Sequence, residues 1–531
     1  MPKIQVLKNT ILLLGILVLA FFAPLPVQLS AQDMPENDQT VYVIRNIDFN
    51  VTGRSKPFAL MRHGEFRTGE RIQGRENFDR YLALRTQFLN NQRVLENRTR
   101  IEYFLGDAEP DGALPVRLLV HVRDSRNFIV LPDPRYSSND GLVITLRARD
   151  YNFLGTMTPL RFDMSYRRSI NDENIFGFIL DLNTPFQYAG YNWNLRFEHQ
   201  LSYDPDKPLR YTGIAGLSLD LPWHNSTFTV GFNQFLFINE ETSSDSKNYY
   251  GVTRLNYDPY NATEIFGAWN LPLGIEVGQF GWLHYTFFTA VRVNYPTIDT
   301  DLVKRPVFTM RNTIGFGRIN WIGNFRKGLS AYTSLSHDFY YDNPDTPTRS
   351  FLDSNLIFHQ PIFRYLSFSS RLRYRQWWRW SNRYDVWLAH DNAGDMLRGV
   401  INDHLHAHRM LSLSLDFPIY LMRFWPSEWL NNRRLSFFNV EVHAAPFTDL
   451  ALLAGPRSRL FPDDDGVKFS LDNMVQTVGL EVIVYSGFYR NLHLRGSIGY
   501  NLDKIRANGL DFRWGFFPNW HEIFIGIELE Y

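Results

Sequence analysis

The sequence predicts an all-β barrel that spans a membrane, preceded by a small α+β domain. Amphipathic, strand-like segments recur from about residue 127 onward, and no segment beyond the first 31 residues is a uniform apolar run long enough for a spanning helix. Aromatic residues make up 16% of the chain, although its mean hydropathy is only -0.28. A barrel with an apolar exterior and a wet interior accounts for this combination.

The charge balance and the lack of cysteine exclude several classes of site. Lys and Arg together number 55, and so do Asp and Glu, so there is no basic excess that would indicate a nucleic acid partner. The sequence contains no Cys. Disulfide bonds, thiol nucleophiles and thiolate metal ligands are therefore excluded.

The N-terminal stretch has the features of an export signal. Lys3 and Lys8 precede an apolar run from Ile11 to Phe22, which is shorter than the ~20 residues needed to span a bilayer. Prolines and small residues follow, and cleavage after Ala31 is expected. We therefore predict a signal peptide over residues 1–31; a retained membrane anchor is the alternative.

A small α+β domain is predicted between Val41 and Asp124. Val41 to Val51 alternates as a strand, and Gly74 to Leu89 has helical spacing. Two further strands are expected at Arg100 to Leu105 and at Val116 to Val122. This set of elements is enough for a complete small domain.

The predicted barrel occupies residues 127–531. In one typical segment Leu160, Phe162 and Met164 alternate with the charged Arg161 and Asp163. A soluble sandwich could also have such strands, but many amphipathic strands without a separate apolar layer bury their faces most simply in lipid. Short and long connections also alternate, as in outer-membrane barrels. The count of segments comes to about eighteen.

The last segment, from His521, reads as the strand that closes the barrel. Its apolar face consists of Ile523, Ile525, Ile527, Leu529 and Tyr531. An ordinary antiparallel strand on a soluble core has the same pattern, so the repetition upstream is what favours the barrel.

Several motifs resemble the BamA/TamA family of outer-membrane assembly proteins. Leu397-Arg398-Gly399-Val400 is similar to the family's Val-Arg-Gly-Tyr/Phe signature at the tip of a loop that folds into the lumen, although Val400 replaces the aromatic residue. A strand ending in Asp416-Phe417-Pro418-Ile419 follows, as in the family. The resemblance implies about 16 strands, and a surplus hairpin would then lie within Asn261 to Tyr295.

Two features nearer the N-terminus extend this resemblance. The Asp150-to-Gly155 stretch is similar to the family's Asp-Asn-x-x-Gly turn, and the Val41-to-Asp124 domain resembles a POTRA domain. Only one such domain fits before the barrel, whereas well-known members have several. The resemblance implies that this domain is periplasmic.

An arginine inside a barrel is costly unless a carboxylate pairs with it. For Arg398 the expected partners are Asp449, in a Phe-x-Asp segment similar to that of the family, and Glu481 on the following strand. The alternative is that Arg398 is an ordinary loop arginine that faces water.

The resemblance implies an outer-membrane protein that helps client polypeptides to insert or to be exported, and not an enzyme. The expected partners are outer-membrane lipid, unfolded or extended client polypeptides, and periplasmic or lipoprotein accessory proteins. No cofactor is expected. A passive porin, a receptor barrel and a barrel phospholipase are the alternatives, although no serine–histidine pair is marked in the sequence.

Three other clusters have simpler interpretations than a ligand site. The alternating His404, His406 and His408 could bind a metal but are expected to line the lumen. Trp377, Trp378 and Trp380 indicate an interfacial aromatic girdle rather than a nucleic acid site. The acidic run at 463–465 lacks the rest of a calcium loop. We predict no metal site.

Overall fold

The computed structural model describes residues 40–529, apart from 138–140, 169–173, 206–208, 239–259, 278–279, 296–305, 341–348, 380–390, 393–396, 401–405, 408, 455–468, 472–473, 490–491, 504 and 506–520. The predicted signal peptide lies outside these residues. The chain forms two compact units. The smaller comprises the residues up to Asn46, Arg67–Ala83 and Tyr103–Leu118, and the larger comprises Ile47–Phe66, Leu84–Glu102 and everything from Leu119 onward.

The N-terminal elements form a mixed α/β arrangement around a four-stranded sheet of order β2-β1-β4-β3. They are β1 (Val41–Thr52), α2 (Pro57–His63), β2 (Arg71–Gln73), α3 (Arg75–Asn91), β3 (Arg100–Leu105) and β4 (Leu114–Arg123). On β4, Val116, Leu118, Val120 and Val122 are buried and alternate with more exposed residues, which is the period of a strand with one apolar face. Among the described residues, no helix is both long and apolar enough to cross a bilayer.

Sequence periodicity missed α2 and β2 because both are short. The signal for α2 was Pro57 at its first turn together with Arg62 and His63 in its last turn. Partial burial lowers the pKa of His63 to about 4. A helix of seven residues is held by its surroundings rather than by its own propensity.

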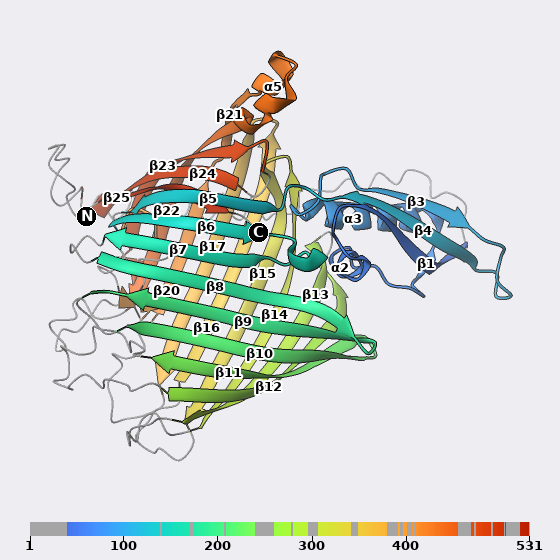
Figure 1. Ribbon diagram of the computed structural model, residues 1–531, viewed down its shortest axis with the longest axis horizontal. Helices are drawn as coiled ribbons and strands as arrows, with labels where there is room; N and C mark the ends of the chain where they lie inside the picture. Colours follow the sequence, from blue (N-terminus) through green and yellow to red (C-terminus); the bar gives the residue numbers. More distant parts are fainter. Residues whose placement is uncertain are drawn as a thin grey trace. The chain divides into compact units, whose positions relative to one another are not determined.

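The remaining strands form one closed antiparallel barrel (Figure 1). In chain order they are β5 (Phe128–Ser137), β6 (Gly141–Asp150), β7 (Leu160–Arg168), β8 (Asn174–Tyr188), β9 (Tyr191–Tyr203), β10 (Arg210–Trp223), β11 (Ser226–Ile238), β12 (Tyr260–Glu276), β13 (Trp282–Tyr295), β14 (Val307–Ile322), β15 (Phe325–Tyr340), β16 (Arg349–Phe363), β17 (Leu366–Arg379), β20 (Arg409–Asp416), β21 (Ile419–Phe424), β22 (Val440–Ala454), β23 (Val475–Ser486), β24 (Leu492–Asn501) and β25 (His521–Leu529). Each neighbour in the sequence is a neighbour in the barrel, and β25 pairs with β5 to close it.

The shorter elements lie in the connections. Residues Phe153–Gly155 form a 3-10 turn between β6 and β7, and α5 (Pro426–Trp429) and a second 3-10 turn (Arg433–Phe438) lie between β21 and β22. The segments β18 (Asp391–Asn392) and β19 (His406–Ala407) pair with each other.

Within the described residues the barrel has 18 strands, which confirms the count of about eighteen segments, whereas the number of about 16 that the resemblance implies is wrong. The segments β20 and β21 both pair with β17 and β22, which makes them two halves of one strand. Pro418 lies at the interruption, where it has no N–H to donate to a ladder. The hairpin expected to be surplus is β12 and β13, which are paired along their length as full members of the barrel.

Apolar residues cover the outward faces of the barrel strands. On β6, Leu142, Ile144 and Leu146 are exposed, whereas Val143, Thr145 and Arg149 on the opposite face are buried. This is the reverse of a soluble sandwich, whose apolar residues would be covered by a second sheet. The structure therefore excludes the sandwich alternative for these strands.

Candidate functional site: the seat of Arg398 and the barrel seam

The tip Leu397–Val400 is held against the inner wall of the barrel by its two apolar residues. Leu397 and Val400 are buried in a cluster with Ala407, Met410, Ala451 and Leu453, on which Val475 also packs. Leu397 and Val400 flank Arg398 and Gly399 in the sequence. Burial of the two apolar residues therefore fixes Arg398 and Gly399 against the neighbouring strands. We call this arrangement the Arg398 seat.

Arg398 meets Asp449 of β22 through three hydrogen bonds. Its backbone N and its Nε donate to Oδ2 at 2.9 and 3.0 Å, and its Nη2 donates to Oδ1 at 2.7 Å. Asp449 is only 1% exposed, so these bonds are charge-assisted and largely shielded from water. The guanidinium also lies 3.8 Å from the centre of the Phe447 ring.

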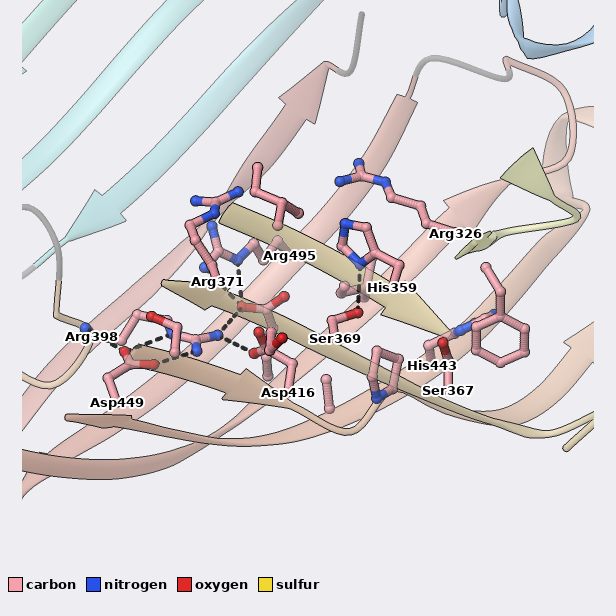
Figure 2. Close-up of a pocket in the computed structure, with 18 of the residues that line it drawn as sticks. Arg326, His359, Ser367, Ser369, Arg371, Arg398, Asp416, His443, Asp449 and Arg495 are labelled. Carbon is pink, nitrogen blue, oxygen red and sulfur yellow. Dashed lines mark hydrogen bonds and ion pairs between the residues drawn. The ribbon is translucent and has the colours of Figure 1, made fainter. Parts of the chain in front are cut away.

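A second carboxylate of the seat was missed by the sequence analysis. Arg398 Nη1 donates to Asp416 Oδ1 at 2.5 Å (Figure 2). The expected partner Glu481 lies farther away, at 3.9 Å from Nη1, and is bonded at 2.8 Å by Arg495 Nε of the next strand. The two carboxylates lie on adjacent strands, and Ser414, two residues before Asp416, is paired with Asp449. This closeness was the signal that could have identified Asp416 as a second partner.

Gly399 brings the tip against the last two strands. Its φ is +85°, and a Cβ at this position would lie 2.7 Å from the Tyr500 nitrogen and 2.8 Å from the Gly499 carbonyl carbon of β24. Its own N–H donates to Glu522 Oε2 of β25 at 2.8 Å. The left-handed backbone and the close approach both require glycine. Glu522 is a second contact that the sequence analysis missed.

The predicted closing strand is β25, whose two edges are paired very differently. Its ladder with β24 runs from Tyr500–His521 to Leu492–Leu529, whereas within the described residues its pairing with β5 covers Ser137–Phe524 and Tyr136–Ile525. We call the β25–β5 edge the seam. Of the predicted apolar face, Ile525 is 60% exposed and Ile523 and Ile527 are partly buried. The side chain of Leu529 and all of Tyr531 lie outside the described residues.

Prolines in β5 explain why the pairing at the seam stops. Continuing the register would set Pro134 opposite Ile527, and neither Pro132 nor Pro134 has an N–H to donate. Side chains serve Ile527 instead: Asp133 Oδ1 accepts from its N–H at 3.2 Å, and Arg147 Nη1 donates to its carbonyl at 3.1 Å. An aspartate and an arginine thus replace the missing backbone partner.

Most residues of the other predicted clusters cannot be placed relative to this site. His404, His408, Trp380 and residues 463–465 lie outside the described residues, as does the side chain of His406. Trp377 stacks on Phe351 with ring centroids 3.9 Å apart. Within the part of the chain that the structure describes, no three His, Asp or Glu side chains are grouped as metal ligands.

Comparison with known proteins finds similarity to solved structures. No family model matches the sequence, and no curated protein matches it. Among solved structures, CdiB from Acinetobacter baumannii is 12% identical, with 92% of this chain and 74% of that chain covered and a TM-score of 0.48. BamA from Haemophilus ducreyi lacking POTRA domains 1–3 is 14% identical, with 91% and 84% covered and a TM-score of 0.42. CdiB from Escherichia coli is 9% identical, with 96% and 93% covered and a TM-score of 0.39. Similarity at this level assigns no function to this chain.

Proposed function

We propose that this chain is an outer-membrane protein of the barrel-assembly or translocation type, which helps client polypeptides to insert into or cross the membrane. The observation that carries the proposal is the Arg398 seat, which joins a loop tip to β20, β22, β24 and β25 beside the seam. A passive pore has no need of a loop fixed to its closing strands. The outward apolar faces of the strands fit the lipid environment.

In this proposal Arg398, Gly399 and their carboxylates position the closing strands, and the seam offers a strand edge. Around Ile527 the edge of β25 is met by side chains rather than by a ladder. A client strand that adds to a sheet edge uses backbone hydrogen bonds, which tolerate many sequences. The proposed partners are therefore extended or unfolded polypeptides, with membrane lipid around the barrel.

The N-terminal region from Val41 to Asp124 is proposed to be a POTRA-like periplasmic domain that receives these clients. Its sheet has β2 and β3 as its outer strands, and Phe104 and Leu105 at the end of β3 are exposed. An outer strand with exposed apolar residues is a surface to which an extended segment can add. Accessory periplasmic or lipoprotein partners would act at the same domain.

The proposal is tested by depleting the protein and surveying the outer membrane by quantitative proteomics. We expect a defined set of outer-membrane or secreted polypeptides to fall, and to recover with the wild-type gene but not with a gene that lacks residues 41–124. The control is an Arg196→Gln gene, since Arg196 pairs with Glu198 of the same strand, away from the seat. If no polypeptide changes in abundance, the assembly function is wrong.

Two serine–histidine pairs bear on the alternative of an enzyme. Ser350 Oγ lies 2.8 Å from His337 Nδ1, and Ser369 Oγ lies 2.7 Å from His359 Nδ1. In the described residues neither histidine has a carboxylate bonded to its second ring nitrogen. A barrel esterase is expected to react with a fluorophosphonate probe, whereas we expect this protein to remain unlabelled. Conductance in a planar bilayer tests the other alternative, because a large and steady current would favour a porin.

A further inference from the structure

A polar cavity of about 680 Å³ lies inside the barrel beside the Arg398 seat (Figure 2). One of its walls is β17, where Ser367, Ser369, Arg371 and Arg373 occupy alternate positions and all line the cavity. Alternate residues of a strand share one face, so the two guanidiniums point to the same side. The volume is within the range of small-molecule sites.

Two other arginines of this cavity are paired with carboxylates. Arg398 is bonded to Asp449 and Asp416, and Arg495 is bonded to Glu481. Arg371 and Arg373 differ from them. Within the described residues, neither guanidinium donates a hydrogen bond or forms an ion pair, although both side chains are partly buried.

The carboxylates that act on these two arginines are already occupied. The strongest attraction on Arg371 comes from Asp416, which Arg398 holds at 2.5 Å. Arg373 is attracted by Asp353, which accepts hydrogen bonds from Arg375 at 3.1 Å and from the Tyr332 hydroxyl at 2.7 Å.

Like charges surround the same two side chains. Arg326 and Arg398 repel Arg371, and Arg371 and Arg375 repel Arg373. Partly desolvated cations that face one another are unfavourable unless an anion lies between them or beside them. The cavity therefore contains an excess of positive charge with free hydrogen-bond donors.

We propose that Arg371 and Arg373 bind a phosphate group in this cavity, as inorganic phosphate or as a small phosphomonoester. The planar guanidinium fork matches two oxygens of a phosphate, and two forks on one strand face match its double charge. The cavity has room for the phosphate and a small ester substituent. This binding does not depend on the proposed assembly function, because a barrel of any function could hold the ligand.

The test is isothermal titration of the full-length, detergent-solubilised protein with sodium phosphate, at ionic strength held constant with sodium chloride. We expect saturable binding to the wild type and an affinity at least about tenfold lower in the double variant Arg371→Gln, Arg373→Gln, since losing one charge-assisted contact corresponds to about tenfold. Arg196→Gln is the matched control and should bind as the wild type does. Titration with glycerol 3-phosphate distinguishes the two sources, because the tighter of the two probes identifies the natural form.

Heat-modifiable migration on a gel establishes that each variant is folded. Should the double glutamine variant not fold, the variant Arg371→Lys, Arg373→Lys keeps both charges but lacks the fork, and we expect it to bind phosphate more weakly. The proposal is overturned if the wild type shows no saturable heat, or if a folded double variant of either kind binds phosphate as tightly as the wild type. Client assembly is a separate measurement, so its failure leaves this result unaffected.

Discussion

Two nearly inaccessible aspartates pair with arginines in this barrel, and their surroundings differ. Asp449 in the Arg398 seat is 1% exposed and receives three hydrogen bonds from Arg398. Asp133 at the seam is 0% exposed, yet among the described residues its Oδ1 alone accepts a hydrogen bond, from Ile527. Its Oδ2 lies 2.9 Å from Arg147 Nη2 as an ion pair without hydrogen-bond geometry, and Arg147 Nε also lacks a partner among the described residues.

The difference shows how the same pair of residue types can either fix a structure or hold it loosely. A fully hydrogen-bonded buried pair specifies one position for its loop. In a partly bonded pair, hydrogen bonds offset only part of the free-energy cost of desolvation. We therefore expect the Arg398 seat to stabilise the last strands of the barrel more than the seam does. Four single substitutions and one reversed pair test this contrast.

The largest effect is expected from Arg398→Ala. It leaves Asp449 and Asp416 without the guanidinium that bonds both of them, and we expect a loss of about 3 kcal/mol in unfolding free energy. Denaturant unfolding of the folded barrel, followed by heat-modifiable migration, measures the loss. Arg398→Lys keeps the charge but not the fork, so it should lie in between. A variant as stable as the wild type would show that the seat is an ordinary solvated loop.

Exchanging the charges of Arg398 and Asp449 is expected to restore little of the lost stability. In Arg398→Asp with Asp449→Arg, the new aspartate would face Asp416 and Glu481, both of which now attract Arg398. The backbone bond from residue 398 to Asp449 would also be lost. Coupling in such a double variant therefore measures the whole carboxylate cluster rather than one pair.

Gly399→Ala is expected to have the next largest effect. A left-handed alanine costs about 1 to 2 kcal/mol, and the clash with the β24 backbone adds to this cost. Gly190→Ala is a matched control, because its φ is +80° and a Cβ there would meet nothing within 4 Å. The prediction is that Gly399→Ala lowers the unfolding midpoint more than Gly190→Ala. Equal effects would mean that the tip does not press on β24.

Asp133→Ala at the seam is expected to cost less in stability, about 1 to 2 kcal/mol, because its pair is already incompletely bonded. The amide of Ile527 would lose its acceptor and Arg147 its carboxylate. Hydrogen exchange measured on peptides from β25 should speed up, whereas peptides from β22 in the Arg398 seat should stay protected. Asp133→Asn keeps an oxygen that can accept from Ile527, so β25 peptides should exchange more slowly in this variant than in Asp133→Ala. Faster exchange in β22 would remove the contrast between seat and seam.

The smallest effect is expected for an exposed pair. Arg71 Nη2 lies 2.6 Å from Asp111 Oδ2 in the N-terminal region, and this guanidinium keeps the pKa of Asp111 below its usual range. A lowered pKa stabilises the folded state when the pH is above 3.8, the ordinary pKa of an aspartate. This stabilisation is lost as the pH falls through the pKa of the folded state. Because both side chains are solvated, Arg71→Gln should leave the unfolding midpoint unchanged at pH 7. A clear loss would show that exposed pairs matter here as much as the seat.

The sequence by itself determined the kind of fold and the order of its parts. Alternation with period two in segments such as Leu160 to Tyr166 identified barrel strands, because the pleat places alternate residues on opposite faces whatever their neighbours. Helical spacing predicted a helix over Gly74 to Leu89, where the structure has α3 (Arg75–Asn91). Alternation predicted a last strand from His521, where the structure has β25 (His521–Leu529). The tip Leu397–Val400 was predicted from its resemblance to a family signature and not from any local rule.

Only the tertiary structure decided which groups meet. Asp416 and Glu522 are 18 and 123 positions from the residues of the tip that they bond, and nothing local distinguishes them from other strand carboxylates. The strand count also depended on pairing, because β20 and β21 become one strand only through their shared neighbours. The seam shows the same limit: the prolines of β5 are plain in the sequence, but their effect appears only when β25 lies beside them and Asp133 and Arg147 take over the bonds that the prolines cannot make.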